Sequence, residues 1–257
     1  MLIDTHAHLY LPRFDKDRDE VLARALENGI EKIYLPNVDS TTIESMLALE
    51  ADQPERCFAM MGLHPCSVKE NVAEELLVVK NWLEKRTFCA VGEIGIDLYW
   101  DKTFFEAQKK AFNDQIGWAI DLDIPIVIHS RESTDIVINI LKERKHPKLR
   151  GIFHCFSGNA EQAEQITQLG FHLGIGGVLT YKKSTLPAAI KDIPLEWLVL
   201  ETDSPYLPPV PFRGKRNESA YIHQIGDYLA SIKQIPLEEV ARQTTKNALR
   251  IFDKSEK

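Results

Sequence analysis

Residues 125–154 of the chain read PIVIHSRESTDIVINILKERKHPKLRGIFH, and this stretch contains a complete strand–helix–strand unit. The segments Pro125–His129 and Gly151–His154 are short, apolar runs of the kind that form buried strands. Between them, four apolar residues repeat at the spacing of one helix face: Ile136, Val137, Ile140 and Leu141. Because the chain must cross back before the second strand begins, the unit predicts two parallel strands, each ending in a histidine.

The same alternation extends along the rest of the chain. Six further segments have the composition of buried strands: Leu2–Thr5, Lys32–Leu35, Cys57–Gly62, Phe88–Glu93, Phe171–Ile175 and Trp197–Glu201. Further apolar stripes with helical spacing fall within residues 21–26, 104–120, 222–232 and 237–251. Eight parallel strands predict an α/β fold, a closed (β/α)₈ barrel of the TIM type, as a single domain over residues 1–257. An open, doubly wound sheet is the alternative.

The composition is that of a folded protein. Apolar residues make up 44% of the chain and charged residues 27%, which provides enough apolar surface to offset the entropy lost on ordering. The formal net charge is −7. A negative balance argues against broad electrostatic capture of nucleic acid, but it leaves room for an enzyme that handles phosphate locally.

Several features favour a cytoplasmic protein. No apolar run approaches the roughly 20 residues that a membrane helix needs. Asp4 directly follows the apolar opening Met1–Ile3, so we expect no signal-peptide core. The cysteines show no C-x-x-C spacing, which favours reduced thiols over a disulfide framework or a structural zinc cage: Cys57, Cys66, Cys89 and Cys155. We expect no membrane partner and no obligate protein partner.

Ionisable side chains gather at the carboxyl ends of the expected strands. Six of them form the candidate metal ligands: His6, His8, Glu93, His129, His154 and Asp203. In a closed barrel these strand ends surround one mouth, and residues two apart on an extended chain point the same way. Burying four imidazoles and two carboxylates together without a cation would be costly. The set therefore predicts a metal site.

Six side chains are more than one catalytic ion takes from a protein, since zinc commonly uses three protein ligands and a water. Two divalent ions that share a bridging carboxylate, about 3.5–4 Å apart, fit the set better. Glu93 lies between the two histidine groups in the sequence and is the expected bridge. Mixed nitrogen and oxygen donors suit zinc or manganese more than magnesium alone, and the sequence does not choose among the three.

Six short blocks stand at or near the expected strand ends: DTHAH (4–8), GLHP (62–65), GEIGID (92–97), HSR (129–131), HCFSG (154–158) and ETDSPYL (201–207). Together and in this order, they resemble the signature blocks of the TatD family of metal-dependent hydrolases. These are DNases within the amidohydrolase-like (β/α)₈ barrels. The resemblance runs from Asp4 to the region of Asn247, which is nearly the whole chain.

The resemblance implies two ligand sets that share Glu93: His6, His8 and Asp203 for one ion, and His129 and His154 for the other. It also implies hydrolysis of phosphodiester bonds in DNA, with 3′–5′ exodeoxyribonuclease action. Within residues 213–219 the family pattern has a proline where this chain has Ser219. That departure concerns the local shape of a loop, since no expected ligand is missing.

Two side chains are candidates for catalysis. Asp203 is expected to ligate one ion and to accept the proton of the attacking water, the alternative being a ligand role alone. His64 follows the third expected strand at the same rim. It either donates to a phosphate oxygen or leaving group, or it belongs only to a His-Pro turn, and the resemblance favours the site.

Basic residues beside the mouth are candidates for substrate binding. Arg131 follows the fifth expected strand and either places its guanidinium on a phosphate or forms a salt bridge at a helix start. Lys215 and Arg216 lie after the last strand, where barrels often bind phosphate, in or beside the irregular stretch 202–217. Gly174–Gly177 either lets backbone amides approach an anion or forms a tight turn.

Three further residues lie next to the expected ligands. Asp4 and Glu201 each precede a ligand by two residues, so each either braces that region or makes an ordinary buried hydrogen bond. Cys155 is expected to point away from its neighbour His154 and into the core.

Taken together, these features predict a two-metal hydrolase whose partner is DNA, as single strands or ends. The alternative is a metallohydrolase of small amides, esters or lactones, because a metal pair also activates water against a carbonyl and a net charge of −7 suits a small substrate. A barrel that binds metal only for stability is less well supported, since structural zinc is usually enclosed by four protein ligands.

Overall fold

The structure is a computed structural model that describes residues 1–252. Within them, eight strands alternate with helices: β1 (Leu2–Asp4), β2 (Ile30–Leu35), β3 (Cys57–Ala59), β4 (Val91–Asp97), β5 (Ile126–Arg131), β6 (Gly151–Phe153), β7 (Phe171–Ile175) and β8 (Leu198–Leu200). The α-helices are α1 (Arg18–Glu27), α2 (Ile43–Asp52), α3 (Val72–Lys85), α4 (Phe105–Leu122), α5 (Thr134–Glu143), α6 (Ala160–Gln168), α7 (Leu186–Ile190), α8 (Ile222–Lys233) and α9 (Leu237–Phe252). Short 3₁₀ helices complete the order: η1 (Pro12–Phe14), η2 (Pro65–Ser67), η3 (Gly177–Thr180), η4 (Leu195–Trp197) and η5 (Ser219–Tyr221).

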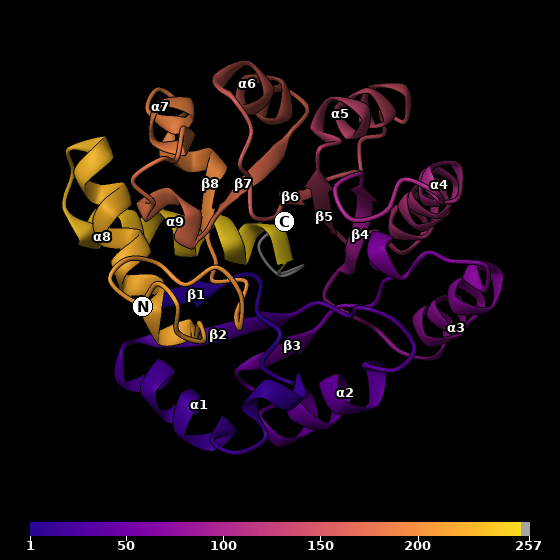
Figure 1. The fold of residues 1–257 in the computed structure, drawn as a ribbon, viewed down its shortest axis with the longest axis horizontal. Helices are drawn as coiled ribbons and strands as arrows, with labels where there is room; N and C mark the ends of the chain where they lie inside the picture. The colour runs from indigo at the N-terminus through magenta and orange to yellow at the C-terminus, as the bar shows by residue number, and fades with distance from the viewer. Residues whose placement is uncertain (253–257) are drawn as a thin grey trace.

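The strands form a closed parallel ring (Figure 1). Ladders join β1, β2 and β3, and separately β4 through β8. Backbone hydrogen bonds close both gaps, because Gly92 N donates to Met61 O at 3.2 Å and Thr5 N donates to Leu200 O at 3.1 Å. The helices pack around the outside, as the strand–helix alternation requires. The (β/α)₈ barrel expected from the sequence is confirmed, and the open doubly wound alternative is wrong.

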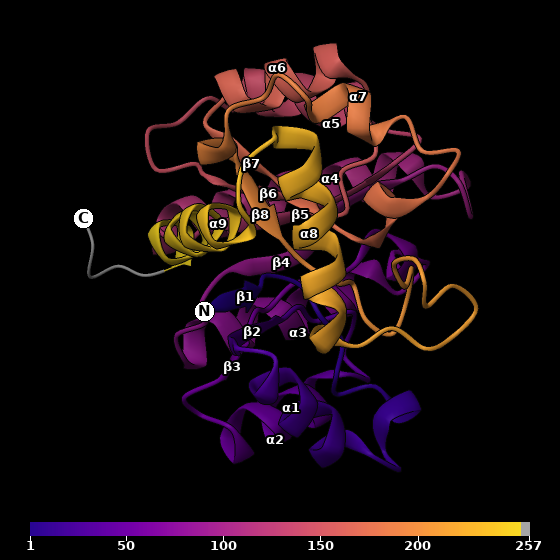
Figure 2. The ribbon, with the colours of Figure 1, turned by 90° about the vertical axis from the view of Figure 1, so that its left-hand side faces the viewer.

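Helix α9 covers the end of the barrel that lies opposite the mouth. An inner cluster of residues in the strands or directly next to them packs against it: Ile3, Tyr34, Met60, Ala90, Val127, Ile152 and Val199. Tyr34 stacks on Phe252 of α9 with ring centroids 3.9 Å apart. Figure 2 shows α9 on one side of the barrel and the loop that follows β8 on the other. The carboxyl ends of the strands therefore stay open.

Strand β4 differs from its predicted bounds, Phe88–Glu93, and continues to Asp97. Its pairing with β5 shifts register between Gly92 and Ile94, so Glu93 lies at a bulge, a feature that re-aims a side chain. Gly95, at φ 148°, lies so close to β5 that a Cβ there would come within 2.0 Å of the His129 carbonyl oxygen. Glycine at this position lets the strand run on beside β5.

The segment that follows β8 has no regular secondary structure. Residues 202–217 contain no helix or ladder, and Ser204 makes an isolated bridge to Ala7. The irregular stretch predicted after the last strand is thus confirmed.

No helix within residues 1–252 combines the length and the apolar composition required to cross a membrane.

Candidate metal centre

The structure brings the six predicted ligands together at the mouth. His6 and His8 follow β1, Glu93 lies in β4 and His129 in β5, and His154 and Asp203 follow β6 and β8. Their ligand atoms, with those of His64, form three overlapping groups, and within each group the atoms lie no more than 4.8 Å apart: His6, His8 and Asp203; His6, Glu93 and His154; His64, Glu93 and His129. Side chains from both ends of the sequence thus meet in one cluster.

Glu93 is the centre of the cluster, and its two oxygens face different histidines. Oε2 lies 3.2 Å from His6 Nε2 and 3.7 Å from His8 Nε2. Oε1 lies 2.8 Å from His129 Nδ1 and 2.9 Å from His154 Nε2. The side chain is 2% exposed. Glu93 therefore joins the histidines on the two sides of the cluster through its two oxygens.

The donor set on the Oε2 side fits a metal ion by its spacing. His6 Nε2 and His8 Nε2 lie 3.3 Å apart. Asp203 Oδ1 lies 3.8 Å from the first nitrogen and 3.6 Å from the second. Donors held about 2.1 Å from a tetrahedral zinc stand about 3.4 Å from one another. These side chains therefore fit one cation without rearrangement of the backbone.

The electrostatics on this side favour the ligating forms of the side chains. Burial would raise the pKa of Glu93, but the imidazoles around it, His154 first, outweigh burial and hold that pKa well below its usual range. The pKa of Asp203 is lowered despite burial, chiefly by its hydrogen bond with His8. Burial and the nearby His154 lower the pKa of His6. Anionic carboxylates and a neutral imidazole are the states that bind cations.

The histidines on the Oε1 side hold protons more tightly when no cation is present. Burial opposes the charged form of His154, but Glu93 and then Glu201 outweigh it and raise the pKa well above its usual range. The pKa of His129 is raised against burial by Asp97 and Glu93. Binding of a cation on this side would therefore release protons.

Two residues that orient the histidines were not identified from the sequence. The Tyr10 hydroxyl lies 2.8 Å from His8 Nδ1 and donates to the Pro36 carbonyl. The hydroxyl therefore accepts a hydrogen bond from His8 Nδ1–H, which leaves the lone pair of His8 Nε2 directed at the cluster. On the Oε1 side of Glu93, Asp97 Oδ2 lies 2.8 Å from His129 Nε2 and accepts a hydrogen bond from that nitrogen. Such partners fix the tautomer and the ring orientation of a metal ligand.

A sequence signal existed for Asp97 in the strand alternation, because Asp97 stands four residues after Glu93 within one extended strand. Residues at even spacing along a strand share a face. Tyr10 lies in a turn beyond β1, where strand alternation gives no signal.

The two residues expected to brace a ligand or to make an ordinary hydrogen bond behave differently. Glu201 Oε1 accepts a hydrogen bond from Cys155 N at 2.5 Å and also lies 3.2 Å from His154 Nδ1, so it makes an ordinary buried hydrogen bond and an ion-pair contact with that ring. Asp4 instead accepts hydrogen bonds from Thr202 N at 2.9 Å and from the His6 backbone N at 3.3 Å. Burial raises the pKa of Asp4 to about 7 against these bonds. Asp4 therefore ties β1 to the chain after β8, without touching an imidazole.

The glycines at the end of β7 and after it leave room for the Glu201 side chain and for the loop that follows β8. A Cβ on Gly174 would come within 2.2 Å of Glu201 Oε2, and a Cβ on Gly177 within 2.1 Å of the Leu207 carbonyl. Leu179 N also donates to the Gly176 carbonyl at 3.0 Å at the start of η3, so the tight-turn interpretation is confirmed. The small residues let Glu201 and the loop after β8 pack close to β7.

His64 is a turn residue that also faces the cluster. Its Nδ1 accepts a hydrogen bond from Cys66 N at 3.0 Å at the start of η2, as a turn residue would. Its Nε2 lies 3.4 Å from Glu93 Oε1 and faces the cluster. The expectation that Cys155 points into the core is wrong, since it lines a second hollow of about 300 Å³ beside the cluster, together with His129 and Asp203. The strand ends at Phe153, so strict alternation no longer applies there.

The three predicted substrate-binding residues occupy different surroundings. Arg131 lines the mouth. Arg216 forms a two-pronged ion pair with Asp17, at 2.6 and 2.8 Å, so its guanidinium is already engaged. Lys215 is exposed and lies over the ring of Phe212, 5.8 Å from its centroid. Neither Lys215 nor Arg216 lines the hollow that holds the cluster.

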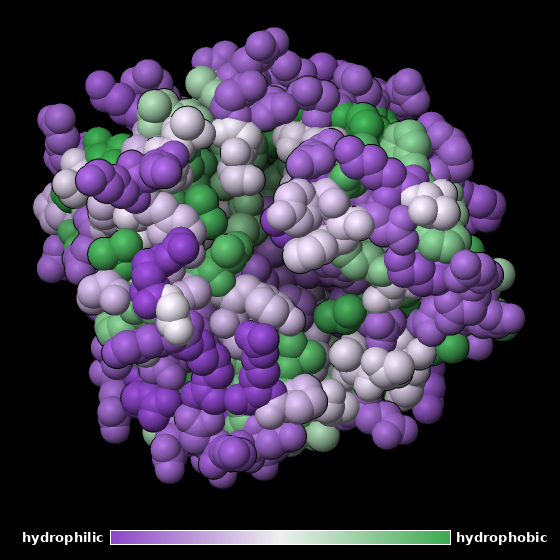
Figure 3. All heavy atoms as spheres, viewed as in Figure 1, coloured by the Kyte–Doolittle hydropathy of each residue, from purple (hydrophilic) through white to green (hydrophobic). Residues whose placement is uncertain are grey.

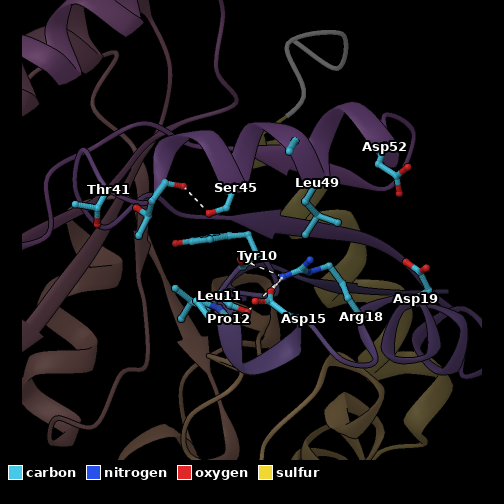
Figure 4. A pocket seen from close by; sticks show the side chains of 12 residues that line it. Tyr10, Leu11, Pro12, Asp15, Arg18, Asp19, Thr41, Ser45, Leu49 and Asp52 are labelled. Atoms are coloured by element: carbon cyan, nitrogen blue, oxygen red, sulfur yellow. Dashed lines mark hydrogen bonds and ion pairs between the residues drawn. The ribbon is translucent and has the colours of Figure 1, made fainter.

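The mouth itself is a hollow of about 420 Å³, lined by residues of the cluster together with Trp100, Arg131 and Tyr206. On the same side of the molecule, Figure 3 shows a surface that is hollowed near its middle and mostly hydrophilic around its periphery. A larger hollow of about 690 Å³ lies beside Tyr10, between the η1–α1 segment and α2 (Figure 4). It contains no imidazole, and its arginine, Arg18, is bonded to Asp15 and to backbone carbonyls. The chemistry therefore distinguishes the mouth as the candidate site.

Comparisons with known proteins extend over nearly the entire chain. Residues 3–253 match the family described as TatD related DNase. The uncharacterized metal-dependent hydrolase YabD of Bacillus subtilis is 38% identical over 253 residues, which cover 98% of this chain and 99% of the relative. The crystal structure of YjjV, a TatD homologue from Escherichia coli, matches with a TM-score of 0.93 at 34% identity and covers 98% of each chain. An uncharacterized amidohydrolase from Saccharomyces cerevisiae, at 19% identity and a TM-score of 0.86, shares the fold.

Proposed function

The chain belongs to the family of TatD-related DNases and is a metal-dependent hydrolase, and from this premise we propose that it is a 3′–5′ exodeoxyribonuclease that uses two divalent ions. The observation that carries the proposal is the placement of Glu93, whose Oε2 faces His6 and His8 while its Oε1 faces a separate group of histidines: His64, His129 and His154. One-metal sites have no need of such a bridge, whereas enzymes that displace phosphate esters commonly use paired ions.

The proposed ligands divide into two sets that share Glu93: His6, His8 and Asp203 on one side, and His129 and His154 on the other. The nitrogen and oxygen donors are compatible with zinc, manganese or magnesium. When bound, the ions supply an acidified water and neutralise charge on the phosphoryl oxygens.

The side chains of the chain itself supply proton transfer and positioning. Asp203, with its Oδ1 directed at the His6–His8 pair, is the proposed acceptor of the proton from the attacking water. His64 accepts a backbone hydrogen bond at Nδ1, so its proton lies on Nε2, which faces the cluster. We assign this proton to the leaving oxygen or to a phosphate oxygen. Arg131 is the proposed phosphate contact, since it lines the mouth.

The shape of the mouth supports action at a chain end. A hollow of about 420 Å³ is in the range of small-ligand pockets. One terminal nucleotide with its phosphodiester fits such a volume, whereas the interior of a duplex is too bulky to enter it. DNA ends and single strands are therefore the proposed substrates.

The test uses single-stranded DNA labelled at the 5′ end or at the 3′ end, with Zn²⁺, Mn²⁺ or Mg²⁺ added in turn. We expect the 5′-labelled strand to shorten stepwise and the 3′-labelled strand to release its label first. Asp203→Ala should abolish this, while Asp121→Ala, an exposed carboxylate of α4, should not. Cleavage no higher than that of Asp203→Ala with all three metals would contradict the proposal. Turnover of a chromogenic ester alone would favour a hydrolase of small esters, amides or lactones.

Two broader features belong to the same proposal. We propose a single domain over residues 1–257, because one large hydrophobic cluster connects strands and helices from β1 to α9. A cytoplasmic setting agrees with the four cysteines, which are free thiols in the structure.

A further inference from the structure

Two aromatic side chains are exposed at the rim of the mouth, immediately after β4. Tyr99 is 49% exposed and Trp100 is 69% exposed. Trp100 also lines the hollow that contains Glu93, His129 and Asp203. Tryptophan is usually highly buried, so a side chain left this open beside a reactive centre indicates a contact with something outside the chain.

Arg131 lies against these rings from the neighbouring strand. Its guanidinium carbon lies 3.7 Å from the centroid of Tyr99 and 5.4 Å from that of Trp100. The side chain is exposed, and no carboxylate within residues 1–252 forms an ion pair with it. A cation without an acidic partner, held over an aromatic ring, is suited to bind phosphate.

The rim aromatics are fixed relative to the catalytic cluster. Asp97 Oδ1 accepts hydrogen bonds from Tyr99 N at 2.9 Å and from Trp100 N at 3.0 Å. Its other oxygen lies 2.8 Å from His129 Nε2. One carboxylate therefore sets both the loop and a candidate ligand. A binding group positioned in this way keeps a constant distance to the reacting bond.

We propose that Tyr99, Trp100 and Arg131 form a nucleobase-binding subsite, in which an unpaired base stacks on Trp100 and Arg131 binds the phosphate next to it. The inference rests on the proposed nuclease function and adds the way in which the substrate is held. Aromatic stacking accepts any base, because every base has a π face, and it requires that face to be free. The subsite therefore selects single-stranded ends and gives little sequence preference.

The test compares two single-stranded oligonucleotides that differ only in their last nucleotides, which carry bases in one and are abasic in the other. Loss of one stacked base costs roughly 5- to 150-fold. Trp100→Ala should therefore lower kcat/KM by that factor on the normal strand, mainly through KM, and leave the abasic strand unchanged. Trp100→Phe should recover part of the loss. Tyr228→Ala, which removes an exposed aromatic of α8, should change neither.

Equal loss on both strands would overturn the subsite, because it would indicate a disturbed loop and not a lost stacking contact. No loss on either strand would overturn it as well. A binding measurement separates this inference from the nuclease proposal: fluorescence anisotropy of a labelled oligothymidylate with the chelator-treated protein. Weaker binding by Trp100→Ala than by Tyr228→Ala supports the subsite even if no strand is cleaved. Equal binding by the two variants overturns it.

Discussion

Asp97 and His129 are joined by a 2.8 Å contact between Oδ2 and Nε2, and this contact fixes which nitrogen of the histidine is free. Because Nε2–H donates to this carboxylate, the neutral form of His129 carries its lone pair on Nδ1, the nitrogen that lies 2.8 Å from Glu93 Oε1, and the proton on Nδ1 is the one that a cation would displace. The pKa of Asp97 is lowered, since the hydrogen bond with His129 outweighs burial. Asp97 thus prepares His129 to bind a cation without contacting the cation itself.

Asp97→Asn reverses this arrangement at almost constant volume. The amide group would donate to Nε2, which moves the imidazole proton to Nδ1 and blocks the ligating atom. We expect metal affinity on that side to fall roughly 10- to 100-fold, measured by competition with a chromogenic chelator. Asp101→Asn, in the same loop and paired with Lys69 at 2.7 Å, is the control and should bind normally. Unchanged affinity in Asp97→Asn would show that the contact is not an orienting one.

Removal of the bridge should affect both proposed ions, whereas removal of a histidine should affect one. We expect Glu93→Ala to lose most of both ions, since Oε2 faces His6 and His8 while Oε1 faces His129. His8→Ala and His129→Ala should each keep one ion. Metal content after dialysis, measured by plasma mass spectrometry, distinguishes these cases. A Glu93→Ala protein that retains one tightly bound ion would argue against a shared carboxylate.

Tyr10→Phe tests whether Tyr10 orients His8, which belongs to the proposed ligand set that does not contain His129. The hydroxyl lies between His8 Nδ1 and the Pro36 carbonyl, and its removal leaves both groups unpaired in a buried place. We expect a loss of about 1–3 kcal/mol in the free energy of unfolding. The metal affinity of the His6–His8 side should fall, with the His129 side unchanged. A two-step metal titration measures the metal affinity of each side, and Tyr228→Phe, at an exposed tyrosine, is the control. Equal weakening of both steps would contradict a local role.

The convergence of the six side chains was predictable because barrel geometry turns a position along a strand into a position at the mouth. His154 and Glu93 are far apart in the sequence, yet Nε2 and Oε1 lie 2.9 Å apart. What allowed the prediction was the repeated pattern of an apolar run followed by an ionisable residue. In a regular fold, such a pattern predicts which side chains lie close together.

Prediction failed where the chain departs from regular structure. The orienting role of Asp97 depends on how far β4 continues beyond its bulge, and the sequence predicted an earlier end. Cys155 has a φ of 46°, so strand alternation does not place its side chain. Arg216 pairs with Asp17 from 199 positions away, and no local pattern marks that partnership.

The loop after β8 is anchored by a partly buried ion pair, and removal of that pair gives a prediction for stability. Glu218 is 7% exposed in its side chain and receives two hydrogen bonds from Arg24 of α1, at 2.8 and 2.9 Å. Arg24→Gln would leave this carboxylate unpaired. Because Arg24 is 40% exposed, water reaches the site and reduces the penalty. We expect a loss of about 1–2 kcal/mol in the free energy of unfolding.

Such a loss corresponds to a Tm about 2–8 °C lower by calorimetry. Lys110→Gln, which removes an exposed pair with Asp114 at 2.9 Å, is the matched control and should shift the free energy of unfolding by less than about 0.5 kcal/mol. Glu218→Gln added to Arg24→Gln should restore much of the stability, because the buried charge is then gone. If Arg24→Gln is no less stable than Lys110→Gln, the pair does not anchor the loop to α1. Recovery in the double variant distinguishes an unpaired charge from lost packing of the arginine.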